Sequence, residues 1–591
     1  MHRRVLILLC VLAGACSPVP RPGPFPGPEP IDLMPEPEIA SPLPVIAARF
    51  QVNQLLAALP LRDKIAQIVM PWVIGGYASF DDSSFSRVER WVDSLHVGGI
   101  IVSIGSPMDV AAKLNRLQRL SWLPLLIASD LEGGTSFRLN GGTPFPTNMG
   151  VAATGSDLDA YEMGRITALE GRAVGIHLNF APVADVNNNP ANPIINTRSF
   201  GENPVMVARL VAAEIRGLQE HGMYATAKHF PGHGDTGTDS HIALPVIRAD
   251  WARLDSLELV PFRAAVKAHV TAIMSAHIAL PGIDSGRTRP ATVNPDVLTG
   301  ILRDSLGFDG LVVTDALNMG ALVNSYGAGE ATVLAFLAGA DLLLQPADPG
   351  VAIDAMVSAV ESGRISRDRL DASVRRVLEL KRRMGLFSRR TVDLERVGAV
   401  VGAVAFRETA EDITARSLVL VKDSANLVET MRTRVRRVTL VSYGDDVGSV
   451  LGSELRSRGY DVSSFRLYPA SGPASYDSAR VMLTGPGIAL FTTAVRATAW
   501  SGTIAMPQAF ADLIDSTSLH QRTLLVSFGS PYLIMQTPSI GSYLLAWQAK
   551  PMSERAVAAA LAGEAPISGH LPISIPGVAA LGYGIERKNR R

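Results

Sequence analysis

Eight short apolar runs, each followed by a segment of helical character, constrain the fold of this chain more than any other feature. Apolar runs that alternate with helical segments are typical of parallel βαβ units. Eight such units in series predict a (β/α)8 barrel, and an open doubly wound sheet is the alternative. No Gly-rich phosphate loop follows the first run, which favours the barrel. The runs span residues 67–73, 98–102, 125–129, 177–183, 224–227, 272–275, 311–314 and 341–345.

Polar side chains follow the predicted strands where each strand ends. In a (β/α)8 barrel this carboxyl-end face carries the functional loops. The residues are Asp130 and Arg138 after the third strand, Arg198 after the fourth, Lys228 and His229 at the fifth, His277 after the sixth and Asp315 after the seventh. We therefore expect these side chains to converge on one site.

The stretch AKHFPGHGDTGTDSH, from Ala227 to His241, concentrates the polar chemistry of the chain. Three interpretations compete for it: a metal site, a solvated loop without function, and an acid/base site. Its histidines and aspartates could be metal ligands, but neither an HExxH pair nor a cysteine partner is present. Asp239 and His241 lie two positions apart, so in an extended segment the carboxylate can reach the imidazole and stabilise its protonated form. We therefore prefer the acid/base interpretation and expect no metal.

Asp315 lies in the segment LVVTDALNMGAL, where an apolar strand gives way to a helical pattern. An aspartate at such a junction often caps the first turn of the helix. It can also be a catalytic carboxylate at the end of a barrel strand. Both interpretations stay open on the residues alone.

The segments KHFPGHG and DTGTDSH together resemble the signature of glycoside hydrolase family 3, in the branch that contains the β-N-acetylhexosaminidases. The resemblance implies that Asp239 and His241 form a catalytic dyad and that Asp315 is the nucleophile. It also implies a grip on the non-reducing terminal sugar through Asp130, Arg138, Arg198, Lys228 and His229. Relatives often carry arginine directly after the DxEGG segment, whereas this chain has Thr135, which leaves the preferred leaving group open.

The resemblance further implies an exo-acting, retaining β-N-acetylglucosaminidase that needs no cofactor. Its carbohydrate substrates would be peptidoglycan fragments or chitooligosaccharides. Three alternatives are a β-glucosidase or β-xylosidase of the same family, phosphorolytic cleavage, and a surface lipoprotein that binds sugar without catalysis. The formal net charge is zero, so nothing in the charge balance suggests nucleic acid as a partner.

The N-terminal residues indicate export. Residues 1–16 combine a basic start, an apolar run and small residues before Cys16, which resembles a bacterial lipoprotein signal. Cys16 would then carry the lipid, and an ordinary secretory signal is the alternative. The proline-rich residues 17–45 would form a tether to the membrane of the cell envelope, at its periplasmic or outer-membrane face. The only two cysteines are Cys10 and Cys16, so no disulfide is expected beyond the signal.

A second alternation of apolar runs and helical segments follows the barrel. We expect the barrel to occupy residues 46–388, a linker residues 389–405, and a smaller α/β sandwich residues 406–591. The strands predicted for the sandwich are residues 418–421, 437–443, 488–493, 523–528 and 543–547. Because the dyad already supplies a proton donor, this domain is expected to be structural or to shape the cleft.

Overall fold

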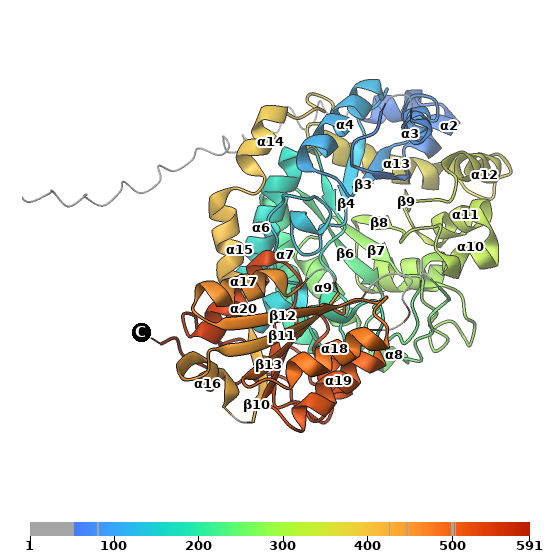
Figure 1. Cartoon of the computed structure of the whole chain (residues 1–591). Coiled ribbons are helices and arrows are strands. Elements are labelled where there is room, and N and C mark those ends of the chain that lie inside the picture. Colours follow the sequence, from blue (N-terminus) through green and yellow to red (C-terminus); the bar gives the residue numbers. More distant parts are fainter. Residues whose placement is uncertain are drawn as a thin grey trace, which may run out of the picture. The chain divides into compact units, whose positions relative to one another are not determined.

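The computed structural model describes residues 52–79, 82–240, 242–424, 426–444, 447–497, 502 and 504–590 (Figure 1). Residues Gln51–Arg591 form one compact unit. Within the described ranges, none of the helices combines the length and the apolar character that crossing a membrane requires. The predicted signal and tether lie outside the described residues.

A ring of parallel strands occupies the first part of the described chain, and it confirms the predicted (β/α)8 barrel. Seven strands form one parallel sheet in sequential order, from β2 to β8. Each predicted run overlaps a strand of the ring. The strands are β1 (Val69–Met70), β2 (Trp72–Ile74), β3 (Gly99–Ser103), β4 (Leu126–Ser129), β5 (Leu178–Asn179), β6 (Tyr224–Phe230), β7 (Ala272–Ser275), β8 (Leu311–Val313) and β9 (Leu343–Leu344).

The ring closes between its first and last strands. β1 pairs in parallel with β9, and a parallel bridge joins Val313 at the end of β8 to Leu342. Pro71 separates β1 from β2 because proline has no N–H to donate to the ladder, but its carbonyl still accepts a hydrogen bond from Ile101. The predicted first strand is therefore a single strand interrupted at proline.

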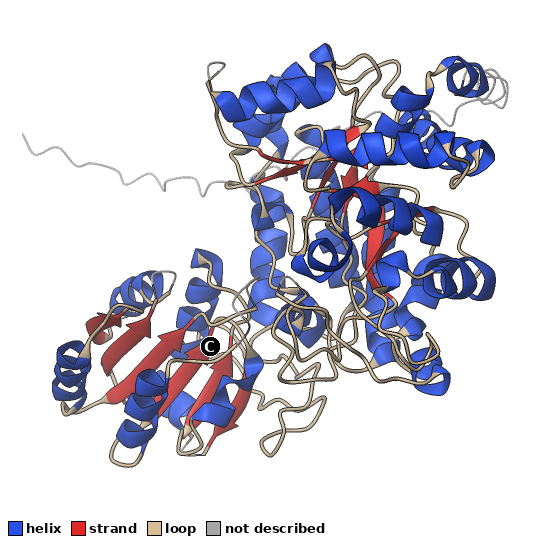
Figure 2. Cartoon of the chain, turned by 90° about the vertical axis from the view of Figure 1, so that its right-hand side faces the viewer, coloured by secondary structure: helices blue, strands red, loops and turns tan. Residues whose placement is uncertain are grey.

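Helices surround the barrel, as the view in Figure 2 shows. The sequence sets their ends: the Ser366 side chain accepts a hydrogen bond from the Arg369 N–H and caps α13, whose last turn is basic. The barrel region contains α2 (Leu61–Ala66), α3 (Ser83–Asp93), α4 (Pro107–Leu120), α5 (Asn148–Ala153), α6 (Asp157–Ala173), α7 (Pro204–Glu220), α8 (Trp251–Ser256), α9 (Leu259–Lys267), the π-helix η4 (Asp296–Ser305), α10 (Gly320–Tyr326), α11 (Ala328–Ala338), α12 (Pro349–Glu361) and α13 (Arg367–Arg383). Two further helices, α14 (Leu394–Val400) and α15 (Val404–Arg416), lead to the second sheet.

The second sheet has six strands in the order β10-β15-β14-β13-β11-β12, and only β10 runs antiparallel to its neighbour. Five of the strands match the predicted ones. The sequence analysis missed β12, an edge strand whose residues Asp461, Ser463 and Ser464 are exposed. The strands are β10 (Val419–Asp423), β11 (Arg437–Tyr443), β12 (Asp461–Leu467), β13 (Ile488–Thr493), β14 (Thr523–Ser527) and β15 (Ser542–Leu545).

Helices cover both faces of this sheet, which confirms the predicted α/β sandwich. One apolar core joins one face of the sheet to α16 (Leu427–Thr433), α17 (Ser449–Ser457) and α20 (Pro551–Ala562). Another core joins the opposite face to α18 (Pro473–Leu483) and α19 (Gln508–Ser518). Each sheet therefore has a buried core of its own.

Polar contacts tie the sandwich to the barrel. Arg416 at the end of α15 forms two hydrogen bonds, of 2.7 and 2.8 Å, with the buried Asp159 carboxylate in α6. The Ser574 hydroxyl donates to Glu202 over 2.6 Å. These contacts join residues far apart in sequence and link the barrel to the sandwich within one compact unit.

Candidate active site

The carboxyl ends of the barrel strands open into a cavity of about 730 Å³. Six of the predicted site residues line it: Asp130, Arg138, Arg198, Lys228, His229 and Asp315. Asp239 is buried, and the adjacent Ser240 lines the cavity. The predicted acid/base residue His241 lies outside the described residues. The structure thus brings together most of the side chains that the sequence placed at the strand ends.

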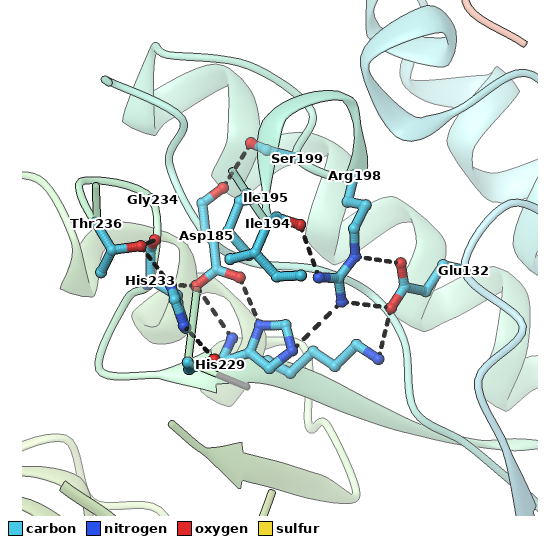
Figure 3. Close-up of polar contacts among 12 residues, drawn as sticks. Glu132, Asp185, Ile194, Ile195, Arg198, Ser199, His229, His233, Gly234 and Thr236 are labelled. Carbon is cyan, nitrogen blue, oxygen red and sulfur yellow. Dashed lines mark hydrogen bonds and ion pairs between the residues drawn. The ribbon is translucent and has the colours of Figure 1, made fainter. Parts of the chain in front are cut away.

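Glu132, just beyond β4, is the central anion of this cavity (Figure 3). Its carboxylate accepts two hydrogen bonds of 2.8 Å from the Arg198 guanidinium and lies 2.7 Å from the Lys228 ammonium. Burial alone would raise the pKa of Glu132, but the two cations hold it well below its usual range. A fixed negative charge therefore orients both cations.

Asp130 belongs to the same charge network and is more exposed than Glu132. Lys228 donates to the Asp130 carboxylate over 2.8 Å, and the Arg138 guanidinium lies 3.6 Å from it. Burial would lower the pKa of Lys228, but Asp130 and Glu132 raise it instead. Lys228 is therefore charged at neutral pH, between two carboxylates in the cavity wall.

The fully buried Asp185 orients His229. The Asp185 carboxylate lies 2.7 Å from the His229 Nδ1 atom and also accepts the backbone N–H groups of His229 and His233. Burial would raise the pKa of Asp185, but its contacts with His229 and His233 lower it. Because an ionised carboxylate only accepts hydrogen bonds, it favours the hydrogen on Nδ1 of His229 and leaves Nε2 near Arg198.

His233 forms hydrogen bonds with two residues of the loop that leads to the predicted dyad. Its Nδ1 atom lies 2.8 Å from the Thr236 hydroxyl, and its Nε2 atom lies 3.1 Å from the Ser240 hydroxyl. Burial lowers the pKa of His233 to about 4, although the nearby Asp185 opposes this shift. The ring is therefore neutral at pH 7 and holds Ser240 against the cavity.

The alternative of a metal site in this loop finds no support among the described residues, where no group of three potential ligands gathers to hold an ion. Asp235 pairs with Arg253 over 2.7 Å, while His229 and His233 are engaged as described above. The side chains of Asp235, His229 and His233 therefore contact other protein groups in this structure.

Asp315 follows β8 and lines the cavity, with its Oδ1 atom accepting a hydrogen bond from the adjacent Ala316 N–H. The next helix, α10, begins only at Gly320, and Met319 occupies its N-cap position. Asp315 is therefore not a helix cap. His277, at the end of β7, contacts the Ala316 carbonyl over 2.9 Å and fixes the backbone beside this carboxylate.

Several buried polar atoms of the cavity residues have no hydrogen-bond partner among the described residues. They are the Ser136 Oγ, Arg138 Nε, Asn148 Oδ1 and Gln548 Oε1 atoms. Buried polar groups normally find partners, so atoms left over in a cavity wall suit a ligand that brings its own donors and acceptors. A polyhydroxylated ligand has this character.

Sequence analysis missed two groups of site residues. Neither Glu132 nor Asp185 was predicted as a site residue, although each follows a predicted strand and Glu132 lies two positions after Asp130 in the DLEGG segment. The contribution of the second domain was foreseen only as shaping the cleft. In the structure its residues Phe528, Trp547 and Lys550 line the cavity.

Comparisons with known proteins relate the chain to one family. The Glycosyl hydrolase family 3 N terminal domain matches residues 60–380. The chain is 31% identical over 503 residues to the Beta-N-acetylglucosaminidase/beta-glucosidase of Cellulomonas fimi, covering 81% of this chain and 88% of that protein. The structure of a glycoside hydrolase family 3 beta-N-acetylglucosaminidase from Paenibacillus sp. str. FPU-7 has a TM-score of 0.79 and 36% identity, over 88% of this chain and 99% of that chain. The structure of the beta-glucoside phosphorylase BglX bound to 2FGlc has a TM-score of 0.82 and 25% identity, over 92% of this chain and 98% of that chain.

Proposed function

Because this chain belongs to glycosyl hydrolase family 3, we propose that it is an exo-acting, retaining β-N-acetylglucosaminidase that releases terminal N-acetylglucosamine. One observation carries the proposal: the paired charges of Asp130, Glu132, Lys228 and Arg198 line the same cavity as Asp315. Such a set can hold one sugar ring beside a carboxylate that attacks it. The names of the similar proteins point to the same sugar.

The charged residues would bind the terminal ring through its hydroxyl groups. A carboxylate such as Asp130 accepts hydrogen bonds from hydroxyls, while lysine and arginine donate to their oxygens. Two cavity-wall atoms that have no partner among the described residues could also bind the sugar: the Asn148 Oδ1 atom as an acceptor and the Arg138 Nε atom as a donor. A ring held on so many sides fixes the glycosidic bond in one place, which suits exo action.

The proposed reaction is a double displacement. Asp315 attacks the anomeric carbon while protonated His241 gives its proton to the leaving oxygen, and the glycosidic C–O bond breaks. Water then attacks the anomeric carbon of the glycosyl ester while His241 takes a proton from that water. The bond between this carbon and the Asp315 carboxylate breaks, and the sugar leaves with its configuration retained. Asp239 would stabilise the imidazolium form of His241. The position of Ser240 in the cavity wall supports this role for the loop.

A comparison of two aryl substrates tests the sugar specificity. The purified protein should cleave an aryl N-acetyl-β-glucosaminide with a higher kcat/KM than the matching aryl β-glucoside, because the site is proposed to be built for the N-acetyl sugar. The relative from Cellulomonas fimi is named for both activities, so the ranking decides the matter. A preference for the glucoside would place the protein among the β-glucosidases.

Phosphorolysis is a second candidate, favoured by the likeness to a beta-glucoside phosphorylase. A neutral histidine base does not repel an anionic acceptor, so inorganic phosphate could replace water in the second step. With an aryl N-acetyl-β-glucosaminide in phosphate buffer, hydrolysis predicts free N-acetylglucosamine as the only sugar product. Formation of the sugar 1-phosphate, detected by ³¹P NMR, would identify a phosphorylase.

We further propose that the chain is exported and anchored to the cell envelope by a lipid on Cys16, with residues 17–45 as the tether. The motif that ends at Cys16 supports this. Expressed in a bacterium, the wild-type protein should incorporate labelled palmitate and sediment with membranes, and Cys16→Ser should do neither. Equal fractionation of both would refute the anchor.

A further inference from the structure

The amino-terminal face of the barrel lies opposite to the active-site cavity. The helices of a (β/α)8 barrel run antiparallel to its strands, so their carboxyl ends lie at this face. The Gln118 side chain near the end of α4 forms two hydrogen bonds with the Leu125 backbone, just before β4. Lys381 near the end of α13 donates to Gln67, just before β1, over 2.6 Å. The segments that follow α4 and α13 therefore belong to the face opposite to the cavity.

Two large aromatic side chains are exposed on this face. Trp122, just after α4, is 52% exposed, and Phe387, just after α13, is 42% exposed. The two segments lie against each other, because the Arg390 guanidinium donates to the Ser121 carbonyl over 2.8 Å. Exposed tryptophan and phenylalanine beside basic residues are typical of surfaces that enter the headgroup region of a membrane.

Arginines accompany these aromatic side chains. The stretch from Arg382 to Arg390 contains four arginines and no carboxylate. Arg383 and Arg389 are exposed, and within the part of the chain that the structure describes neither side chain forms an ion pair or a hydrogen bond. The nearby Glu379 carboxylate is already paired with Arg382 over 2.8 Å. The exposed positive charge of this segment is therefore not neutralised by the protein itself.

Arg172, at the end of α6, belongs to the same group of cations. Burial lowers its pKa, and the positive charge of the nearby Arg389 lowers it too. Its Nη1 atom has no hydrogen-bond partner among the described residues. Burial raises the pKa of Tyr224 at the start of β6, and the charges of Arg383 and Arg172 oppose that shift. Arginines from three segments thus lie near one another, and such a group suits an anionic partner.

The chain enters the compact unit beside α13. The described residues begin at Val52, and the side chain of the next residue, Asn53, accepts a hydrogen bond from Arg375 of α13 over 3.2 Å. In the sequence, the proposed tether of residues 17–45 ends shortly before this contact. The proposed lipid anchor is therefore connected to the body next to the helix that leads into the arginine-rich stretch.

From these observations we propose that Trp122, Phe387, Arg172, Arg383 and Arg389 form a surface that binds an anionic membrane. The aromatic side chains lie among the lipid headgroups, and the guanidinium groups contact the lipid phosphates. The exposed aromatic side chains favour a lipid surface over a soluble polyanion. The active-site cavity then opens away from the membrane. The inference rests on the proposed location at the cell envelope and is independent of the sugar specificity.

Vesicle binding by a chain that starts at residue 46 tests this surface without the proposed anchor, since residues Gln51–Arg591 form a compact unit of their own. Three arginines near an anionic surface each contribute a factor of about five. The protein should therefore bind vesicles of phosphatidylglycerol and phosphatidylcholine about 100-fold more tightly than vesicles of phosphatidylcholine alone. High salt should weaken this binding. The double variant Arg383→Gln, Arg389→Gln should bind the anionic vesicles about 25-fold more weakly than the wild type.

A matched variant controls for the overall charge. Arg434→Gln, Arg522→Gln removes two exposed arginines of the sandwich and should bind the anionic vesicles as the wild type does. Equal binding of the wild type to both kinds of vesicle would overturn the inference. Equal losses in the two double variants would do the same, because the position of the charge would then be irrelevant.

The aromatic side chains distinguish a membrane from a soluble polyanion. Trp122→Ser, Phe387→Ser should weaken binding to anionic vesicles and leave binding to heparin unchanged, whereas a wild type that binds heparin but not vesicles would refute the lipid surface. All variants should keep the wild-type kcat/KM on an aryl N-acetyl-β-glucosaminide, also when bound to vesicles. A wild type without this activity would reject the proposed function, and a chain without a lipid on Cys16 would reject the anchor; neither result changes what the vesicles measure.

Discussion

Glu132 is the single residue whose replacement should disturb the site most, because its buried carboxylate is the ion-pair partner of two cations. Its partners Arg198 and Lys228 lie within 2.8 Å of its oxygens. Removing one member of a buried ion pair leaves the partners desolvated without compensation, which typically costs about 3 to 5 kcal/mol. The positions of the Arg198 and Lys228 side chains in the cavity therefore depend on the Glu132 carboxylate.

We expect Glu132→Gln to lower kcat/KM by about 100-fold or more, because the amide keeps the shape but not the charge that orients Arg198 and Lys228. Steady-state kinetics on an aryl N-acetyl-β-glucosaminide measure the effect. Glu330→Gln is the matched control, since Glu330 pairs with Arg364 on the surface, and it should stay within about twofold of the wild type. Equal activity of both variants would show that Glu132 is not needed.

The lowered pKa of His233 predicts how the free energy of unfolding changes with pH. The unfolded chain takes up a proton on this residue near pH 6.5, whereas the folded site accepts it only at about pH 4. Stability is therefore lost as the pH falls through this window, by about 2 kcal/mol between pH 7 and pH 5. Denaturant unfolding of His233→Asn should show a correspondingly weaker pH dependence than the wild type. His520→Asn, at an exposed position, should behave as the wild type; a shared pH profile for all three proteins would contradict the assignment.

The limits of sequence analysis are also clear at this scale. Asp130 and Asp315 could be proposed because each follows an apolar strand, and strand ends converge in a barrel. The partnership of Glu132 with Arg198 could not be predicted, since 66 residues separate them and no local pattern links them. The same holds for Arg496 and Lys550, which reach the cavity only through the packing of a second domain.

At the scale of elements, the His277 side chain connects the segments that follow β7 and β8. The His277 ring lies between the Thr292 hydroxyl and the Ala316 carbonyl, and so joins the loops after both strands. The barrel strands were predictable because each lies in a mainly apolar run, as in the fully buried β3. The edge strand β12 was missed because serines and an aspartate interrupt its apolar pattern.

We expect His277→Ala to lower kcat by about tenfold while KM changes by less than about twofold, because the backbone beside Asp315 loses a fixed contact but the sugar-binding charges remain. His277→Gln can still reach one of the two partners and should recover part of the loss. Kinetics of both variants measure the split. A rise in KM with unchanged kcat would assign His277 to substrate binding instead.

For the whole molecule, the ion pair between Arg416 and Asp159 links the sandwich to the barrel. Arg416→Met should lower the free energy of unfolding by about 2 to 4 kcal/mol, because the buried Asp159 carboxylate loses both of its hydrogen bonds from the guanidinium. Arg480→Met, which breaks an exposed pair, should cost less than about 0.5 kcal/mol. Chemical denaturation measures both values, and equal losses would mean that the link between the domains is not stabilising.

The central claim is that Asp315 becomes glycosylated during turnover. A 5-fluoro analogue of N-acetylglucosaminyl fluoride slows both steps but keeps a good leaving group, so the covalent intermediate should accumulate. Peptide mass spectrometry should then find the sugar on Asp315, and Asp315→Ala should be folded, inactive and unlabelled. A sugar attached to any other residue, or full turnover by the alanine variant, would contradict the account.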